Sequence, residues 1–196
     1  MNSKQILMGI VALAVLAGGG YYLYNSATPE TPENTDGNAE EEVVLTTFSS
    51  DELGLSFDYP ASYTLETQAD GNEERSWTTL VIIEASIREE YEASGAMEGP
   101  PAITVQVFEN IEGYELEEWI TTTSYSNYKL ATDEVLLEGE VGGEPARAYA
   151  YSGLYENNSI VVAHEGKIYM FTVSWLTQDD QNINDFGNLL ESVKFD

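Results

Sequence analysis

His164 is the only histidine in the 196-residue chain, and it stands directly before Glu165. A serine hydrolase would need such a histidine between a serine nucleophile and an acid. The sequence contains no Gly-x-Ser-x-Gly nucleophile elbow. Cysteine is also absent, which excludes a thiolate nucleophile, Cys-ligated zinc, disulfides and an acylated cysteine. We therefore interpret His164 as a solvated turn residue and predict no catalytic residues, no cofactor and no enzymatic activity.

The segment Asp70-Gly71-Asn72-Glu73-Glu74 is rich in the oxygen atoms that calcium prefers as ligands. It lacks the alternating Asp/Asn spacing and the distal Glu of an EF-hand loop. We predict an acidic turn there that binds cations only weakly, and the sequence defines no set of metal ligands. The 35 acidic residues also offer many carboxylate pairs of the glycosidase kind, but no pair stands out.

Two further segments could carry binding or modification. Glu89–Pro101 is mixed in composition and ends in Gly99-Pro100-Pro101, so we predict a long loop. Long loops on a rigid sheet often bind partners, and a variable surface loop is the alternative. Asn157-Asn158-Ser159 matches a glycosylation acceptor, but three-residue matches are common by chance and we assign it no role.

The charge balance restricts the partners. Seven basic residues stand against 35 acidic ones, which gives a formal net charge of −28. This surface lacks the basic patch that nucleic-acid binding requires, and anionic lipid head groups would repel it. It suits solubility, cation attraction or a basic partner.

The N-terminus carries a membrane-directed segment. Residues 6–24 are almost wholly apolar and end in a tyrosine cluster, so they are just long enough to span a bilayer and to place aromatic rings at its interface. Lys4 is the only basic residue before Arg75, which places the N-terminus in the cytoplasm and the rest outside. We predict a single-pass anchor over residues 1–24, and a cleaved signal peptide is the alternative.

Residues 25–44 are predicted to be an acidic, disordered linker. The stretch is rich in proline, asparagine and acids and has no hydrophobic period, so it cannot bury enough apolar surface to offset chain entropy. Residues 45–196 then form one folded domain.

Alternating apolar residues and turn signals predict the strands of this domain. Single strands are predicted over Leu53–Tyr59, Tyr63–Gln68 (ending at a turn at Asp70-Gly71), Ser76–Ile87 and Ile103–Val107. Two hairpins are predicted, Val135–Val141 with Glu144–Tyr151 around Gly142-Gly143, and Ile160–His164 with Lys167–Trp175 around Glu165-Gly166.

Two helices complete the pattern. Leu116, Trp119 and Ile120 fall at helical spacing behind a run of acids, which favour the positive end of the helix dipole. A C-terminal helix carries Ile183, Phe186, Leu190 and Val193 on one face. The order of strands, helix, hairpins and helix predicts an α+β domain with helices packed on a central antiparallel sheet.

Three stretches carry a family resemblance. They are Leu53-Gly54-Leu55-Ser56-Phe57-Asp58-Tyr59-Pro60, Gly142-Gly143-Glu144-Pro145-Ala146-Arg147-Ala148-Tyr149, and Lys167–Ser174 together with Leu189–Phe195. Together they resemble the PsbP-like family, over most of the chain after about Thr46. The resemblance implies an α/β/α sandwich around an antiparallel sheet, in an exported bacterial protein. The family is named after a photosystem II accessory subunit, and many similar bacterial members have no known role.

The chain departs from the photosynthetic members in its single histidine and its few basic residues. These departures leave no multi-histidine metal site and no lysine-mediated docking, so no functional residues carry over. The sequence therefore predicts a membrane-anchored, extracytoplasmic accessory or interaction module with a protein partner outside the cytoplasm. A ligand- or cation-binding exported domain is the alternative.

Overall fold

The computed structural model describes residues 43–72, 75–95, 98–131 and 133–196. The predicted anchor (residues 1–24) and residues 25–42 of the predicted linker lie outside the described residues, so both remain predictions. Within the described ranges, no helix is long and apolar enough to cross a bilayer.

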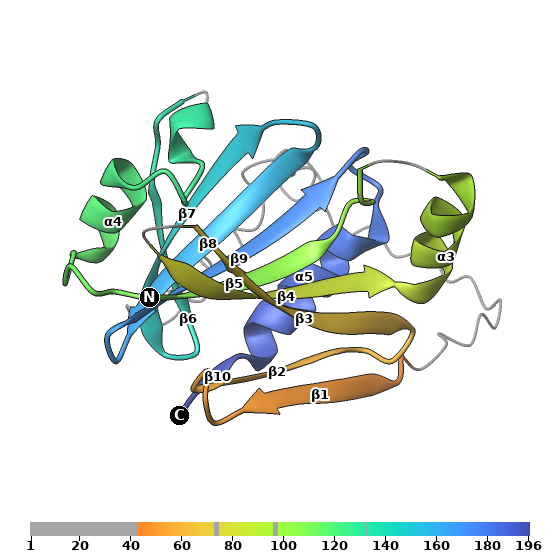
Figure 1. Cartoon of the computed structure of the whole chain (residues 1–196), viewed down its shortest axis with the longest axis horizontal. Helices are drawn as coiled ribbons and strands as arrows, with labels where there is room; N and C mark the ends of the chain where they lie inside the picture. The colour runs from red at the N-terminus through yellow and green to blue at the C-terminus, as the bar shows by residue number, and fades with distance from the viewer. Residues whose placement is uncertain (1–42, 73–74, 96–97, 132) are drawn as a thin grey trace, which may run out of the picture.

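A seven-stranded sheet forms the centre of the domain (Figure 1). Every neighbouring pair in it is antiparallel, so the predicted antiparallel sheet and α+β class are confirmed. The strands, in spatial order, are β3 (Tyr63–Gly71), β4 (Ser76–Glu84), β5 (Ile103–Glu109), β9 (Lys167–Trp175), β8 (Glu156–His164), β7 (Glu144–Ser152) and β6 (Leu137–Val141).

Both predicted hairpins are present. β6 and β7 meet at Gly142-Gly143, and β8 and β9 meet at Glu165-Gly166. Strand β8 begins earlier than predicted, at Glu156 rather than Ile160, because the polar residues Asn157, Asn158 and Ser159 are buried in the sheet. The turn predicted at Asp70-Gly71 lies further along, since β3 runs through Gly71 and the backbone N–H of Asn72 donates to the Arg75 carbonyl at 2.8 Å.

A second, three-stranded sheet consists of β1 (Leu45–Ser50), β2 (Leu55–Pro60) and β10 (Lys194–Phe195). Strand β2 corresponds to the predicted Leu53–Tyr59 strand, with Leu53 in the preceding turn. The sequence patterns do not predict β1 or β10. Strand β1 is mostly exposed and shows no buried alternation, and β10 is only a two-residue pairing with β2.

The helices are α3 (Ala85–Ser94), α4 (Leu116–Thr122), the single 3₁₀ turn η1 (Tyr128–Leu130) and α5 (Gln181–Ser192). Helix α3 corrects two predictions, because the predicted strand Ser76–Ile87 ends at Glu84 and the predicted loop Glu89–Pro101 begins inside a helix. None of the residues of α3 is buried, so it lacks the apolar stripe by which helices are recognised. It ends at Gly95, whose φ of +68° is the left-handed conformation of a helix C-cap.

Helices α4 and α5 confirm the two predicted helices and lie on opposite faces of the large sheet (Figure 1). Helix α4 buries Trp119 and Ile120. Helix α5 buries Phe186, Leu189 and Leu190, and it ends one residue before Val193, which is buried beyond the helix.

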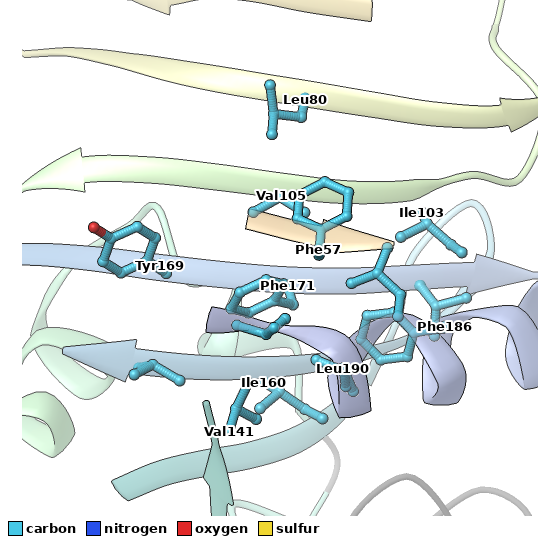
Figure 2. Close-up of a cluster of buried hydrophobic side chains, with 14 of the residues drawn as sticks. Phe57, Leu80, Ile103, Val105, Val141, Ile160, Tyr169, Phe171, Phe186 and Leu190 are labelled. Atoms are coloured by element: carbon cyan, nitrogen blue, oxygen red, sulfur yellow. The ribbon is translucent and has the colours of Figure 1, made fainter. Parts of the chain in front are cut away.

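The main core lies between the large sheet, α5 and strand β2. Figure 2 shows Phe57 of β2 and Phe186 and Leu190 of α5 gathered around Phe171 of β9. The opposite face of the sheet carries a second cluster, where Phe108 and Met170 pack against Trp119 of α4. Successive residues of β9 therefore belong to two different cores, because successive side chains of a strand point to opposite faces of the sheet.

Candidate functional site

His164 is part of the packing and is not the solvated turn residue that the sequence suggests. Its side chain is 18% exposed, and its Nδ1 lies 2.9 Å from Glu144 Oε1. Its ring stacks on Phe195, with the centroids 5.1 Å apart. No hydrogen-bond partner among the described residues reaches Nε2. The described part of the chain therefore places no serine hydroxyl on this ring in the manner of a catalytic triad.

The predicted acidic turn and the glycosylation match gain no support. Asp70 lies on strand β3, while Glu73 and Glu74 lie outside the described residues. Among the described residues, no group of three or more His, Cys, Asp or Glu side chains could hold a metal ion. Asn157, Asn158 and Ser159 are all buried in β8, so this acceptor asparagine is inaccessible in the folded domain.

A pocket of about 290 Å³ lies between α3 and the start of α5. Its walls come from strand ends, from α3 and from the connections into β5 and α5, which all meet at one end of the sheet (Figure 1). It is lined by Tyr63, Ile82, Ile83, Glu84, Ile87, Glu90, Tyr91, Pro101, Ala102, Leu176, Asp180, Gln181 and Asn182.

A second pocket of about 250 Å³ lies further along α5, where the helix faces the three-stranded sheet. It is lined by Val43, Leu45, Asp58, Tyr59, Pro60, Asp185, Asn188, Glu191 and Ser192.

The two pockets meet at one hydrogen bond. The hydroxyl of Tyr63, in the first pocket, donates to Oδ2 of Asp185, in the second, at 2.6 Å. Gln181, Asp185, Asn188 and Ser192 follow one another at spacings of four, three and four residues, which places them on one face of the helix. We call the two pockets and the Tyr63–Asp185 pair the α5 groove.

Charge in the α5 groove has one sign. Among the described residues, it is lined by no Lys, Arg or His and by six acids: Asp58, Glu84, Glu90, Asp180, Asp185 and Glu191. Asp185 is only 6% exposed, and it accepts hydrogen bonds from Tyr63 and from Gln181 Nε2 at 3.2 Å. Among the described residues it has no cationic partner within ion-pair distance.

Two ionisable groups of the groove are held in fixed protonation states. Burial raises the pKa of Tyr63, and the hydrogen bond to Asp185 and that group's negative charge raise it further, so Tyr63 remains a donor. Burial would raise the pKa of Asp180, but hydrogen bonds from the Thr177 hydroxyl and from the backbone N–H groups of Leu176 and Thr177 lower it overall. Asp180 is therefore ionised, and its carboxylate holds the turn at Leu176 and Thr177 that leads into α5.

Comparison with solved structures identifies the architecture. The domain superposes on the solution structure of cyanobacterial PsbP (CyanoP) from Synechocystis sp. PCC 6803, with a TM-score of 0.52 at 13% identity, over 85% of this chain and 100% of that one. The domain has a PsbP-like fold. A crystal structure from Bacteroides thetaiotaomicron VPI-5482 matches at 6% identity with a TM-score of 0.46, over 76% of this chain and 48% of that one. No protein-family model and no curated protein matches the sequence.

The sequence indicated only part of the groove of this PsbP-like domain. Glu90, Tyr91 and Pro101 belong to the Glu89–Pro101 segment that the sequence singles out as a place for binding, and the structure brings them into the first pocket. Tyr63 and Asp185 carry no sequence signal, because they are 122 positions apart in the chain.

Replacing Tyr63 with phenylalanine is expected to lower the free energy of unfolding of the PsbP-like domain by about 2 kcal/mol, because a nearly buried carboxylate loses one of its two donors. Urea denaturation followed by circular dichroism measures the change. Tyr59→Phe is the matched control, since the Tyr59 hydroxyl makes no hydrogen bond to another described residue. Equal effects of the two substitutions would contradict the importance of the Tyr63–Asp185 bond.

Proposed function

We propose that this protein is a membrane-anchored, extracytoplasmic interaction module without catalytic activity. The observation that carries the proposal is the α5 groove, two acid-lined pockets along one helix that the Tyr63–Asp185 hydrogen bond connects. Small-molecule and peptide sites are concave and mostly apolar, with a few polar groups that fix orientation. The groove has this composition, and no described histidine lies among its carboxylates.

The place where the chain enters the domain supports a tethered role. Val43 and Leu45, the first described residues on the way from the predicted anchor, line the second pocket. In Figure 1 strand β1 begins at the end of the molecule where α3 lies. Residues 25–42 span at most about 60 Å when fully extended. A domain anchored in this way would present the α5 groove within reach of the membrane and of other membrane proteins.

The fold agrees with this role. An accessory function is what the resemblance to the PsbP-like family implies, and the likeness to cyanobacterial PsbP supports the architecture on which that resemblance rests. Function resides in sites that are added to a fold, so the groove carries the proposal and the fold supports it.

The test is site-directed photo-cross-linking of the full-length protein in its native membrane, followed by co-purification. One cross-linking residue replaces Leu176 at the rim of the first pocket, and the control replaces Ile111, which is 76% exposed. Leu176 follows the end of β9 that pairs with Ile103, whereas Ile111 follows the opposite end of β5, so the two probes sit at opposite ends of the sheet.

We expect one stoichiometric protein partner from the Leu176 position and none from the Ile111 position. Capture of the same partner from both positions would contradict the groove as the binding surface. A clean monomer at both positions would contradict an interaction module. Substrate turnover that His164→Ala abolishes would show that the protein is an enzyme.

A further inference from the structure

From the chemistry of the α5 groove we infer that it binds an extended peptide segment with lysine or arginine at every second position. This inference rests on the proposed function and specifies the partner of the same site. It follows from three properties of the groove, which are its charge, its apolar residues and its length.

The charge calls for a cation. In the part of the chain that the structure describes, six acids line the groove and no basic side chain does. Asp185 is the informative one, because a carboxylate with 6% exposure normally has a cationic partner, and no described Lys, Arg or His supplies one. Its two hydrogen-bond donors, Tyr63 and Gln181, are neutral. A cation from outside the domain would compensate this charge and gain from the acids around it.

The apolar residues of the first pocket favour a cation that is carried on an aliphatic side chain. Ile87, Pro101 and Ala102 contribute accessible apolar surface to the first pocket. Long basic side chains bury their methylene stems on such a surface while the charged head remains among polar groups. The rings of Tyr63 and Tyr91 line the same pocket, and aromatic faces attract ammonium and guanidinium groups. A hydrated metal ion would use neither these apolar residues nor the rings.

The length of the α5 groove favours an extended peptide that carries more than one cation. Gln181, in the first pocket, and Ser192, in the second, stand eleven positions apart on α5, which is about 16 Å along a helix axis. About five residues of extended chain cover that length, and their side chains point alternately to opposite sides. A hexapeptide with lysine at every second position would therefore place cations in both pockets and across the Tyr63–Asp185 pair.

The experiment measures binding of a fluorescent, end-capped peptide, Lys-Leu-Lys-Leu-Lys-Leu, to the full-length protein in nanodiscs of zwitterionic lipid at 50 mM NaCl. The groove variant is the double substitution Glu90→Gln/Glu191→Gln, with one change in each pocket. The matched control is Glu109→Gln/Glu140→Gln, which removes two equally exposed charges from β5 and β6. All four side chains are exposed, so both variants should fold.

We expect the groove variant to bind about tenfold more weakly than the unchanged protein, from two partly screened charges, and the control variant to bind within twofold. The peptide Glu-Leu-Glu-Leu-Glu-Leu should bind at least tenfold more weakly than the lysine–leucine peptide. So should the lysine–leucine peptide with 2,4-diaminobutyric acid in place of each lysine, because this residue keeps the charge and has an aliphatic stem that is two CH₂ groups shorter.

Three results would overturn the inference. If both variants weaken peptide binding equally, the peptide is attracted by the overall negative charge of the protein and not by the groove. Equal binding of the diaminobutyrate–leucine peptide would show that the apolar residues of the first pocket do not contribute to binding. No binding of the lysine–leucine peptide, while a partner is still captured from Leu176, would overturn the cationic chemistry and leave the interaction module intact.

Discussion

Replacing Phe171 with alanine is expected to lower the free energy of unfolding by about 3–5 kcal/mol, the range for removing a phenyl ring from a packed core. Phe171 is 0% exposed and lies in β9, between β5 and β8 of the large sheet. The ring meets residues of β2 and α5 in the main core (Figure 2). Small domains are stable by only about 5–15 kcal/mol, so this one cavity removes a large part of the total. Urea denaturation followed by circular dichroism measures the loss.

The control for this prediction is Leu154→Ala. Leu154 is 63% exposed in the turn between β7 and β8, so removing its side chain should change stability by less than about 0.5 kcal/mol. If Phe171→Ala lowers the free energy of unfolding no more than Leu154→Ala does, the three-stranded sheet and α5 do not pack against β9 as described above.

The hairpins could be predicted from the sequence because their information is local. Glu165 and Gly166 both have positive φ values, and the strands on either side alternate between the two cores, with Phe171 on one face and Met170 on the other. A turn signal between two such runs sets pairing and register together. Trp119 and Ile120 predict α4 for the same reason, since the residues that it buries stand at helical spacing.

Helix α3 could not be predicted from hydrophobic spacing. It buries no residue, so the apolar run from Leu80 to Ile83 extends the predicted strand up to Ile87. The available signals were helix-forming residues, the Arg88–Glu92 pair at a spacing of four, which the structure joins by an ion pair, and Gly95 as a stop. Helix propensity without buried residues is a weak signal, but at α3 it indicates the correct structure and the hydrophobic pattern does not.

The groove could not be predicted because its parts are joined only by the tertiary fold. Tyr63 begins an edge strand of the large sheet and Asp185 lies in the last helix. Their contact depends on how α5 crosses the sheet, which no short stretch of sequence encodes. The abundance of acids also hides the pattern, since 35 acidic residues make a run of carboxylates uninformative until the structure shows which ones share a cavity.

Replacing Gly142 with alanine is expected to lower the free energy of unfolding by about 3 kcal/mol. Gly142 has a φ of +59°, and a Cβ atom there would lie 2.8 Å from two ring carbons of Phe195. The left-handed conformation costs a residue with a Cβ about 1–2 kcal/mol, and overpacking costs about 1–3 kcal/mol more. Phe195 cannot turn away freely, because its ring packs against His164 and Tyr169, with centroids 5.1 and 4.9 Å away.

Gly143→Ala separates the two costs. Gly143 also has a positive φ, +88°, but nothing lies within 4 Å of the position of its Cβ, so this substitution should cost only the conformational part, about 1 kcal/mol. The difference of about 2 kcal/mol between the two variants measures how firmly Phe195 and strand β10 hold the three-stranded sheet against the β6–β7 turn. Equal losses in urea denaturation would show that the C-terminal residues yield without cost. The pairing of β10 with β2 would then contribute little to stability, and β2 and α5 would be sufficient to hold the three-stranded sheet in place.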